Sequence, residues 1–314
     1  MTSTTIKPAT AAAREQSTRM KHSISVVLPN FNGRQLLEKN LPSIIDALIG
    51  LEHEIIIVDD CSTDDSVRFI QQNYPDIVLI QNEVNQGFST TCNTGIFAAK
   101  FPLLCVANTD VTFTPEYFTQ LVDEFDDPSL FAVKGDIINY ASSYEDVMSV
   151  DRTTTLYYKR GFLRFDTSDP LTHRAAFSGE DNIFVGLGCC FVCDTEMMRK
   201  LNGFDEIYSP FYWEDSDLAR RAMSSGYKLL YLPGAIVYHQ ASSTIGNYRS
   251  NAQRRLVSNR NKFLFSWQHL DSKTFWTSHV PTTALNLLVR WLILDWKYYV
   301  AFYNALIRKL TFKR

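Results

Sequence analysis

The 314-residue chain lacks several features that would assign it to a class at once. It has no uncharged apolar stretch of about 18 residues, the length that a membrane-spanning helix requires. Its six cysteines show no disulfide-framework spacing, and the run Cys189-Cys190-x-x-Cys193 has no second Cys/His pair near it, which argues against a zinc site. We therefore expect reduced thiols, as in a cytosolic protein.

A charge of one sign is also missing. The formal net charge is −3, which gives no indication of nucleic-acid binding. No Gly-x-Gly-x-x-Gly follows the first expected strand, which argues against a dehydrogenase. Residues 1–22 are rich in Thr, Ala and Ser without an apolar core, so we predict a disordered leader rather than a secretory signal, and a cytoplasmic protein.

What the chain does contain is a regular alternation of apolar runs and segments with helical spacing. The runs that we interpret as strands are Ile24–Leu28, Glu54–Val58, Ile77–Ile80 and Leu103–Ala107. Strands that alternate with helices predict a mostly parallel sheet with right-handed crossovers and helices on its faces. The expected fold class is therefore α/β.

Polar residues follow three of these strands, as Pro29-Asn30, Asp59-Asp60 and Asn108-Thr109-Asp110. The carboxyl ends of parallel strands share one edge of the sheet, where α/β proteins bind ligands. Clustered carboxylates are costly unless something positive lies among them, such as a metal ion or the ring N–H of uracil or thymine. In the structural alternative, Asp110 serves only the turn before a helix that begins near Pro115.

A second group of acids, Glu214 and Asp215, follows three aromatic residues. Acids suit the first turn of a helix, and Asp217 with Arg221 forms an i,i+4 pair, so a structural interpretation explains Asp217 well. An aromatic wall beside a carboxylate also raises its pKa and suits a general base or a sugar-binding surface. His239, at the end of a later strand, is either a hydrogen-bonded structural residue or a ligand.

Taken in order, these motifs resemble glycosyltransferase family 2, whose members have the GT-A fold. The resemblance covers about Ser23 to Gln240 and is closest to bacterial enzymes that build polysaccharides and lipid-linked glycans, including rhamnosyltransferases. The motifs that carry it are Pro29-Asn30-Phe31-Asn32, Asp59-Asp60-x-Ser62-x-Asp64, Asn85-x-Gly87-Phe88, Asn93-x-Gly95, Asn108-x-Asp110, Gly203-Phe204-Asp205-Glu206, Glu214-Asp215-x-Asp217-Leu218 and His239.

The resemblance implies a role for each site residue. Asp60 would bind the nucleotide base, Asp110 would ligate Mg²⁺ or Mn²⁺, and His239 would contact the metal or the diphosphate. Asp215 would be the catalytic base, with Glu214 beside it. Asn108 replaces the first acid of the Asp-x-Asp motif, which leaves one charge fewer for the metal. The other residues assigned to the donor are Pro29, Asn30, Phe31, Asp59 and Asn93.

The implied activity is that of an inverting glycosyltransferase of polysaccharide biosynthesis in the cell envelope. It would move a sugar from a UDP- or dTDP-type donor to a hydroxyl of a glycan or lipid-linked acceptor. A nucleotidyltransferase is one alternative, but a Gly-rich basic loop is expected after its first strand, and here Arg34 is the only basic residue. A non-catalytic scaffold is another alternative, against which the intact Asp110 and Asp215 argue.

The expected organisation is a catalytic domain over 23–247, with a nucleotide half over about 23–110 and an acceptor half over about 111–247. Within it, Ser142 to Asp181 shows no clear periodicity and predicts a functional loop or lid, or disorder. A Ser/Thr/Gly-containing loop over 241–247 is of the kind that closes over a phosphate.

Residues 248–314 are predicted to form a C-terminal helical extension. One helix is expected over Gln253–Leu270, and apolar residues recur at helical spacing from Thr283 to Leu310. This aromatic and basic stretch fits three arrangements: contact with an anionic membrane surface through 283–314, packing on the catalytic domain, or a homodimer. The expected location is accordingly cytoplasmic, with peripheral contact to the inner face of the membrane as one option.

Overall fold

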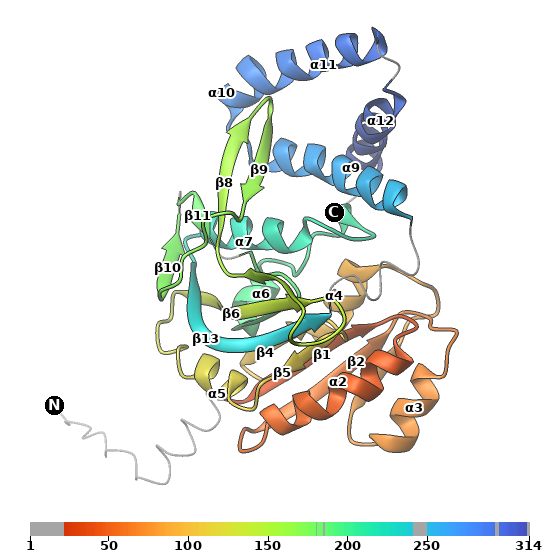
Figure 1. The fold of residues 1–314 in the computed structure, drawn as a ribbon, viewed down its shortest axis with the longest axis vertical. Helices are drawn as coiled ribbons and strands as arrows, with labels where there is room; N and C mark the ends of the chain where they lie inside the picture. The colour runs from red at the N-terminus through yellow and green to blue at the C-terminus, as the bar shows by residue number, and fades with distance from the viewer. Residues whose placement is uncertain (1–21, 180, 185, 241–249, 293–294, 313–314) are drawn as a thin grey trace, which may run out of the picture.

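The computed structural model describes residues 22–179, 181–184, 186–240, 250–292 and 295–312 (Figure 1). Of the predicted leader, residues 1–21 lie outside the described residues, and so does the predicted phosphate-closing loop over 241–247.

A ten-stranded sheet organises the part of the chain that the structure describes. Two of its strands, β5 (Val111–Phe113) and β7 (Val147–Asp151), are short and pair with β13 and β6 outside the main order. The order of the others across the sheet is β10 (Ala175–Ser178), β13 (Lys228–Gln240), β6 (Leu130–Tyr140), β12 (Cys190–Asp194), β4 (Leu103–Ala107), β1 (Ile24–Asn30), β2 (His53–Asp59) and β3 (Val78–Gln81).

The strands β3, β2, β1 and β4 are parallel, and β13 runs parallel to β6. Between these groups β12 is antiparallel to both β4 and β6. All five residues of β4 are buried, which is why this strand reads as an unbroken apolar run in the sequence. The prediction of a mostly parallel central sheet is confirmed.

Helices cover both faces of the sheet (Figure 1). The side chains of β1 alternate between two cores, with Val26 and Leu28 in one and Val27 in the other. The first core is closed by α2 (Arg34–Ala47), α3 (Ser66–Asn73) and α5 (Tyr117–Val122). The second is closed by α4 (Phe88–Ala98), α6 (Thr195–Lys200) and α7 (Glu214–Ser224).

The stretch from Ser142 to Asp181 contains strands, so the prediction of an irregular segment was wrong. Besides β7 and β10, it forms a hairpin of β8 (Thr154–Lys159) and β9 (Phe162–Asp166), to which β11 (Ile183–Phe184) adds. The hairpin turns at Arg160 and Gly161, which both have positive φ. Its Tyr, Thr and Arg residues hide the alternation, but Leu156, Phe162 and Leu163 are buried in the core.

The C-terminal extension is helical, as predicted. It consists of α9 (Asn251–His269), α10 (Ser272–Thr274), η2 (Phe275–His279), α11 (Val280–Leu292) and α12 (Trp296–Thr311). The periodic stretch from Thr283 to Leu310 is thus two helices, and α12 packs along α9 through the buried Ala301 and Ala305. Within the described residues, no helix combines the length and the apolar character needed to cross a bilayer.

Candidate active site

The ends of β1 and β2 lie side by side and are joined by hydrogen bonds. The Asn30 side-chain amide donates to Asp59 Oδ2 at 2.7 Å, and the backbone N–H of Ser62 donates to Asp59 Oδ1 at 2.9 Å. Both side chains are buried, with 1% of Asn30 and 2% of Asp59 exposed. Pro29 and Phe31, on either side of Asn30, are half-buried. The predicted convergence of these strand ends is therefore present, and Asp59 anchors the turn after β2.

Asp60 follows directly and holds the loop between β3 and α4. Its Oδ1 accepts from the Asn82 amide at 2.9 Å and from the Gln86 backbone N–H at 2.8 Å, and its Oδ2 accepts from Gly87 N at 2.9 Å. A carboxylate oxygen has two lone pairs, so Oδ2 keeps capacity for one further donor. The assignment of Asp60 to the nucleotide base stays a prediction.

Asn93 makes structural contacts. Its amide donates to Phe204 O at 2.9 Å and to Glu206 Oε1 at 3.1 Å, and its Oδ1 accepts from the Phe204 backbone N–H at 2.9 Å. Asn93 therefore ties α4 to the turn after α6. These hydrogen bonds do not test the predicted contact of Asn93 with the nucleotide-sugar donor, which stays a prediction.

Asp110 and His239 are brought together by the pairing of β5 with β13. Val111 is in register with His239, and Gln240 N donates to Asp110 O at 3.0 Å. The imidazole Nε2 lies 3.3 Å from Asp110 Oδ1, and Nδ1 donates to Asn139 Oδ1 at 2.6 Å. This arrangement differs from the turn-and-cap alternative, because a strand rather than a helix follows Asp110.

The surroundings of this pair favour positive charge. Burial alone lowers the pKa of His239, but the neighbouring Cys189 sulfur and the Asp110 carboxylate raise it, to about 11. Among the described residues, no group of three or more His, Cys, Asp or Glu side chains is arranged to hold a metal. One carboxylate and one imidazole that gives up its Nε2 proton when a metal binds nevertheless fit a Mg²⁺ or Mn²⁺ ion whose remaining ligands are substrate phosphates and water.

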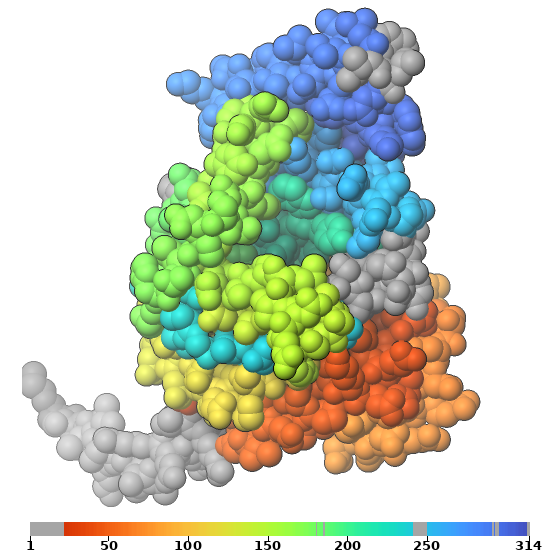
Figure 2. All heavy atoms as spheres, viewed as in Figure 1, coloured from red at the N-terminus to blue at the C-terminus, as the bar shows by residue number. Residues whose placement is uncertain are grey.

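Asp215 lies in the first turn of α7 and connects to this pair through two consecutive residues. Gly188 N donates to Asp215 Oδ2 at 3.1 Å. The next residue, Cys189, interacts with His239, and its carbonyl accepts from Asn108 N at 2.9 Å. In Figure 2 the surface is hollowed where the teal segment around α7 is seen between the green β8–β9 hairpin and the blue α9.

Glu214 occupies a different environment from Asp215. Its side chain is 8% exposed, and its Oε2 has no hydrogen-bond partner among the described residues. Burial, and then the charge of Asp215, raise the pKa of Glu214 to about 8, so it is protonated at neutral pH. It follows Tyr212 and Trp213, which both have positive φ. Its predicted catalytic role stays a prediction.

The free energy of unfolding of wild type is expected to fall from pH 5 to pH 8, and the Glu214→Gln variant is expected to lack this fall. The unfolded chain loses this proton near pH 4.3 and the folded protein near pH 8. Stability therefore falls between these values, by about 1.4 kcal/mol per pH unit, and the neutral amide removes that loss. Urea unfolding at both pH values measures it, with the exposed Glu196→Gln as control. Parallel pH dependences for wild type and Glu214→Gln would contradict the raised pKa.

The C-terminal helix α9 holds the loop that leads into α7, a role that the sequence did not reveal. The fully buried Asn261 amide donates to the backbone carbonyls of Tyr208, Phe211 and Tyr212 at 2.7, 3.0 and 2.8 Å. In the same helix, His269 Nε2 lies 2.8 Å from Asp217 Oδ1. The extension is thus an integral support of the segment that carries Asp215.

Two further buried polar residues support the site. Asn40 donates to Thr109 O at 2.8 Å and accepts from Thr112 Oγ1 at 2.8 Å, which fixes the turn that carries Asp110. Its position on the apolar side of α2 was a sequence signal, because a buried amide there needs partners.

Lys134 is the second, and it lies within the strand β6 with 3% of its side chain exposed. Its Nζ donates to Gly186 O at 2.8 Å and to Arg152 O at 3.3 Å, so it underlies the loop that presents Gly188 N to Asp215. Burial lowers the pKa of Lys134, and nearby acids, Asp151 and Asp215 among them, oppose that shift.

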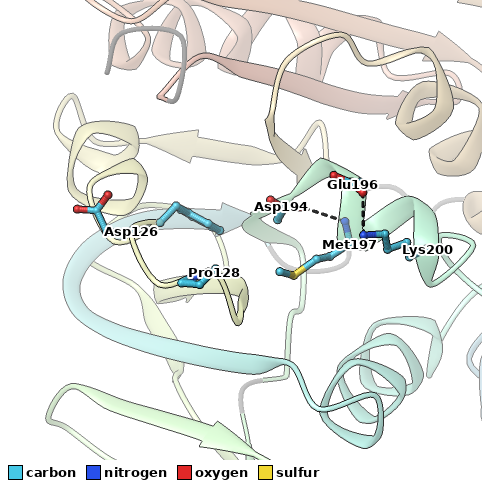
Figure 3. Close-up of a pocket in the computed structure, with 7 residues that line it drawn as sticks. Asp126, Pro128, Asp194, Glu196, Met197 and Lys200 are labelled. Atoms are coloured by element: carbon cyan, nitrogen blue, oxygen red, sulfur yellow. Dashed lines mark hydrogen bonds and ion pairs between the residues drawn. The ribbon is translucent and has the colours of Figure 1, made fainter. Parts of the chain in front are cut away.

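A surface pocket lies at the other edge of the sheet (Figure 3). Asp194, one of its lining residues, pairs with Leu103 at the amino end of β4, whereas Asp110 follows the carboxyl end. This pocket is therefore distinct from the site of Asp110 and Asp215. Its lining is Phe125, Asp126, Pro128, Asp194, Glu196, Met197 and Lys200.

The sheet order, with acidic residues at the carboxyl ends of its strands and a further acid at the start of α7, is that of a GT-A fold. Comparison with known proteins agrees with this class. The family model described as "Glycosyl transferase family 2" matches residues 25–201. The chain belongs to this family, as its motifs predicted.

Curated relatives match in part. A pre-mycofactocin glycosyltransferase of Mycobacterium tuberculosis (strain ATCC 25618 / H37Rv) is 26% identical over 73% of this chain and 45% of its own length. A dolichol-phosphate mannosyltransferase of Pyrococcus furiosus is 29% identical over 35% of this chain and 32% of its own length. The chain therefore spans less than half the length of these relatives.

Solved structures show the same fold. The mannosyltransferase PcManGT from Pyrobaculum calidifontis, in complex with GDP-Man and Mn²⁺, has a TM-score of 0.54 and 15% identity, over 93% of this chain and 76% of that one. GalNAc-T7 with UDP, GalNAc and Mn²⁺ has a TM-score of 0.58 and 16% identity, over 83% of this chain and 51% of that one. Identities this low establish the fold alone.

Proposed function

We propose that this protein is an inverting, metal-assisted glycosyltransferase. It transfers a sugar from a nucleoside diphosphate sugar of UDP or dTDP type to a hydroxyl group of a glycan or lipid-linked acceptor, with Asp215 as the base. The observation that carries the proposal is the connection of Asp215 to the Asp110–His239 pair through Gly188 and Cys189. In this proposal Asp215 would be the proton acceptor, and the Asp110–His239 pair would be the site for a cation.

Each residue has a defined task in this mechanism. Asp110 and His239 would hold Mg²⁺ or Mn²⁺, which would neutralise charge on the departing diphosphate. Asp60, with Asp59 at the end of the same strand and Asn30 at the end of the neighbouring strand, orients the nucleoside. Asp215 accepts the proton of the acceptor hydroxyl as that oxygen attacks the anomeric carbon. A single displacement from the face opposite the diphosphate inverts the anomeric centre.

The catalytic unit that we propose differs from a simple division into a domain over 23–247 and an appendage over 248–314. Because Asn261 and His269 support the segment before and within α7, the extension works together with the catalytic domain. The cysteines are free, which suits the cytoplasmic setting and the cell-envelope glycan synthesis that we propose.

A screen of nucleotide sugars tests the function. We expect calorimetry to detect binding of UDP or dTDP sugars that requires Mn²⁺ or Mg²⁺ and is abolished by a chelator, and slow hydrolysis of the sugar donor. Nuclear magnetic resonance of the transferred sugar should show the anomeric configuration opposite to that of the donor. Absence of any metal-dependent binding of a nucleoside diphosphate would support the scaffold alternative, and transfer of a nucleotidyl group would support the nucleotidyltransferase.

A further inference from the structure

Helices α11 and α12 carry a stripe of apolar side chains that the described residues leave exposed. We call this stripe the C-terminal apolar face. On α11 its members follow at intervals of three and four residues, so they lie on one side of the helix. They are Leu285, Leu288, Val289 and Leu292 of α11, and Trp296, Tyr303, Ile307 and Leu310 of α12.

The exposure of these side chains is concentrated rather than scattered. Leu288, Leu292 and Leu310 are 64%, 75% and 73% exposed. Of the nineteen large apolar side chains exposed in the described residues, ten lie between Trp276 and Leu310. Single exposed apolar residues are ordinary, but a concentration of this kind marks an interaction surface.

The face lies on the outer side of the helices. The opposite side of α12 carries Ala301 and Ala305, which are fully buried, and α11 buries Thr283. In Figures 1 and 2 the blue helix α11 forms one end of the molecule, beyond the β8–β9 hairpin. A flat partner could therefore reach this end without meeting the sheet.

Charge identifies the partner. Residues 272–312 contain five basic residues and one acid, Asp295, which is ion-paired with Arg290. The whole chain has a net charge of −3, so the rest of it has an excess of acids. Lys273, Lys297 and Lys309 are exposed around the face. The C-terminal apolar face is therefore a cationic surface on an acidic protein, and its charge is complementary to that of an anionic partner surface.

From these observations we propose that the C-terminal apolar face docks on the surface of an anionic lipid bilayer. Helices with an apolar side and basic flanks lie in the plane of such a surface. Trp276 and Trp296, which are 65% and 63% exposed, have the amphipathic rings that favour the headgroup level. A second copy of the chain fits less well, because a twofold contact would bring the lysines of both copies together. The inference does not depend on the proposed catalytic activity.

Co-sedimentation of the full chain with vesicles tests the proposal. We expect binding to vesicles with about one-third phosphatidylglycerol, much weaker binding to pure phosphatidylcholine, and release by salt. The double variant Leu288→Glu/Leu292→Glu should lower the partition coefficient at least about tenfold. Ile49→Glu, at an equally exposed apolar residue on the nucleotide half, is the matched control and should bind like wild type.

The outcomes separate the partners. The proposal is wrong if wild type does not sediment with anionic vesicles, or if the double variant binds as wild type does. It is also wrong if, without lipid, wild type is a dimer in analytical ultracentrifugation and the double variant is a monomer, because the face then joins two copies. Circular dichroism and donor hydrolysis by the double variant should match wild type, which separates a lost docking surface from lost folding.

Discussion

The Asp215→Asn variant is expected to lose about three orders of magnitude in kcat while its affinity for the donor changes little. Asparagine has the same shape, and its carbonyl oxygen can still accept the hydrogen bond from Gly188 N, so the loop geometry is retained. What is lost is the ability to accept the proton of the acceptor hydroxyl. Steady-state transfer kinetics, with calorimetry of donor binding, measure the two effects separately.

The control for this variant is Glu196→Gln, which changes an exposed carboxylate on α6 by the same chemistry and should leave kcat unchanged. Asp215→Glu is expected to retain part of the activity, because it keeps the base but displaces it. Full transfer activity in Asp215→Asn would refute the assignment of the base and leave the family membership intact. A loss confined to KM would instead indicate a role in acceptor binding.

The nucleotide half of the fold was predictable because local and global signals agree there. The apolar runs from Ile24 to Ala107 are all strands, of which β1, β2 and β4 are buried and β3 is a more exposed edge strand, and each carboxyl end is polar. Parallel strands must present those ends at one edge, so Asn30, Asp59 and Asp60 could be placed together without knowing the sheet order. Asp110 and His239 were harder, since their proximity depends on the antiparallel pairing of β5 with β13.

The missed residues act through contacts that join distant parts of the chain. Asn261 reaches the loop before α7 across about fifty positions of sequence, and Asn40 reaches Thr109 across 69. Their sequence signal is weak, because a polar residue on the apolar side of a helix indicates that a partner exists but not which one. The β8–β9 hairpin was missed for a related reason, since its buried residues face α9, whose position the sequence does not give.

The Asp110→Asn variant is expected to lose metal-dependent donor binding almost completely. The substitution removes the one carboxylate of the Asp110–His239 pair, and a neutral amide is a weak ligand for Mg²⁺ or Mn²⁺. Because Asn108 has already replaced the other acid of the motif, no second carboxylate of that motif remains to compensate. We expect affinity for the nucleoside diphosphate in Mn²⁺ to fall by about two orders of magnitude, measured by calorimetry.

The nucleoside alone provides the internal comparison, because the proposed base contact at Asp60 belongs to another strand end and needs no metal. Asp110→Asn should therefore bind uridine or thymidine as weakly as wild type does. It should lose only the increment in binding affinity that the diphosphate and Mn²⁺ add together. Asp65→Ala, which removes a 73%-exposed carboxylate just after β2, should change neither quantity. If Asp110→Asn kept that increment, the cation would be held elsewhere, and the proximity of Asp110 to His239 would serve only to join β5 to β13.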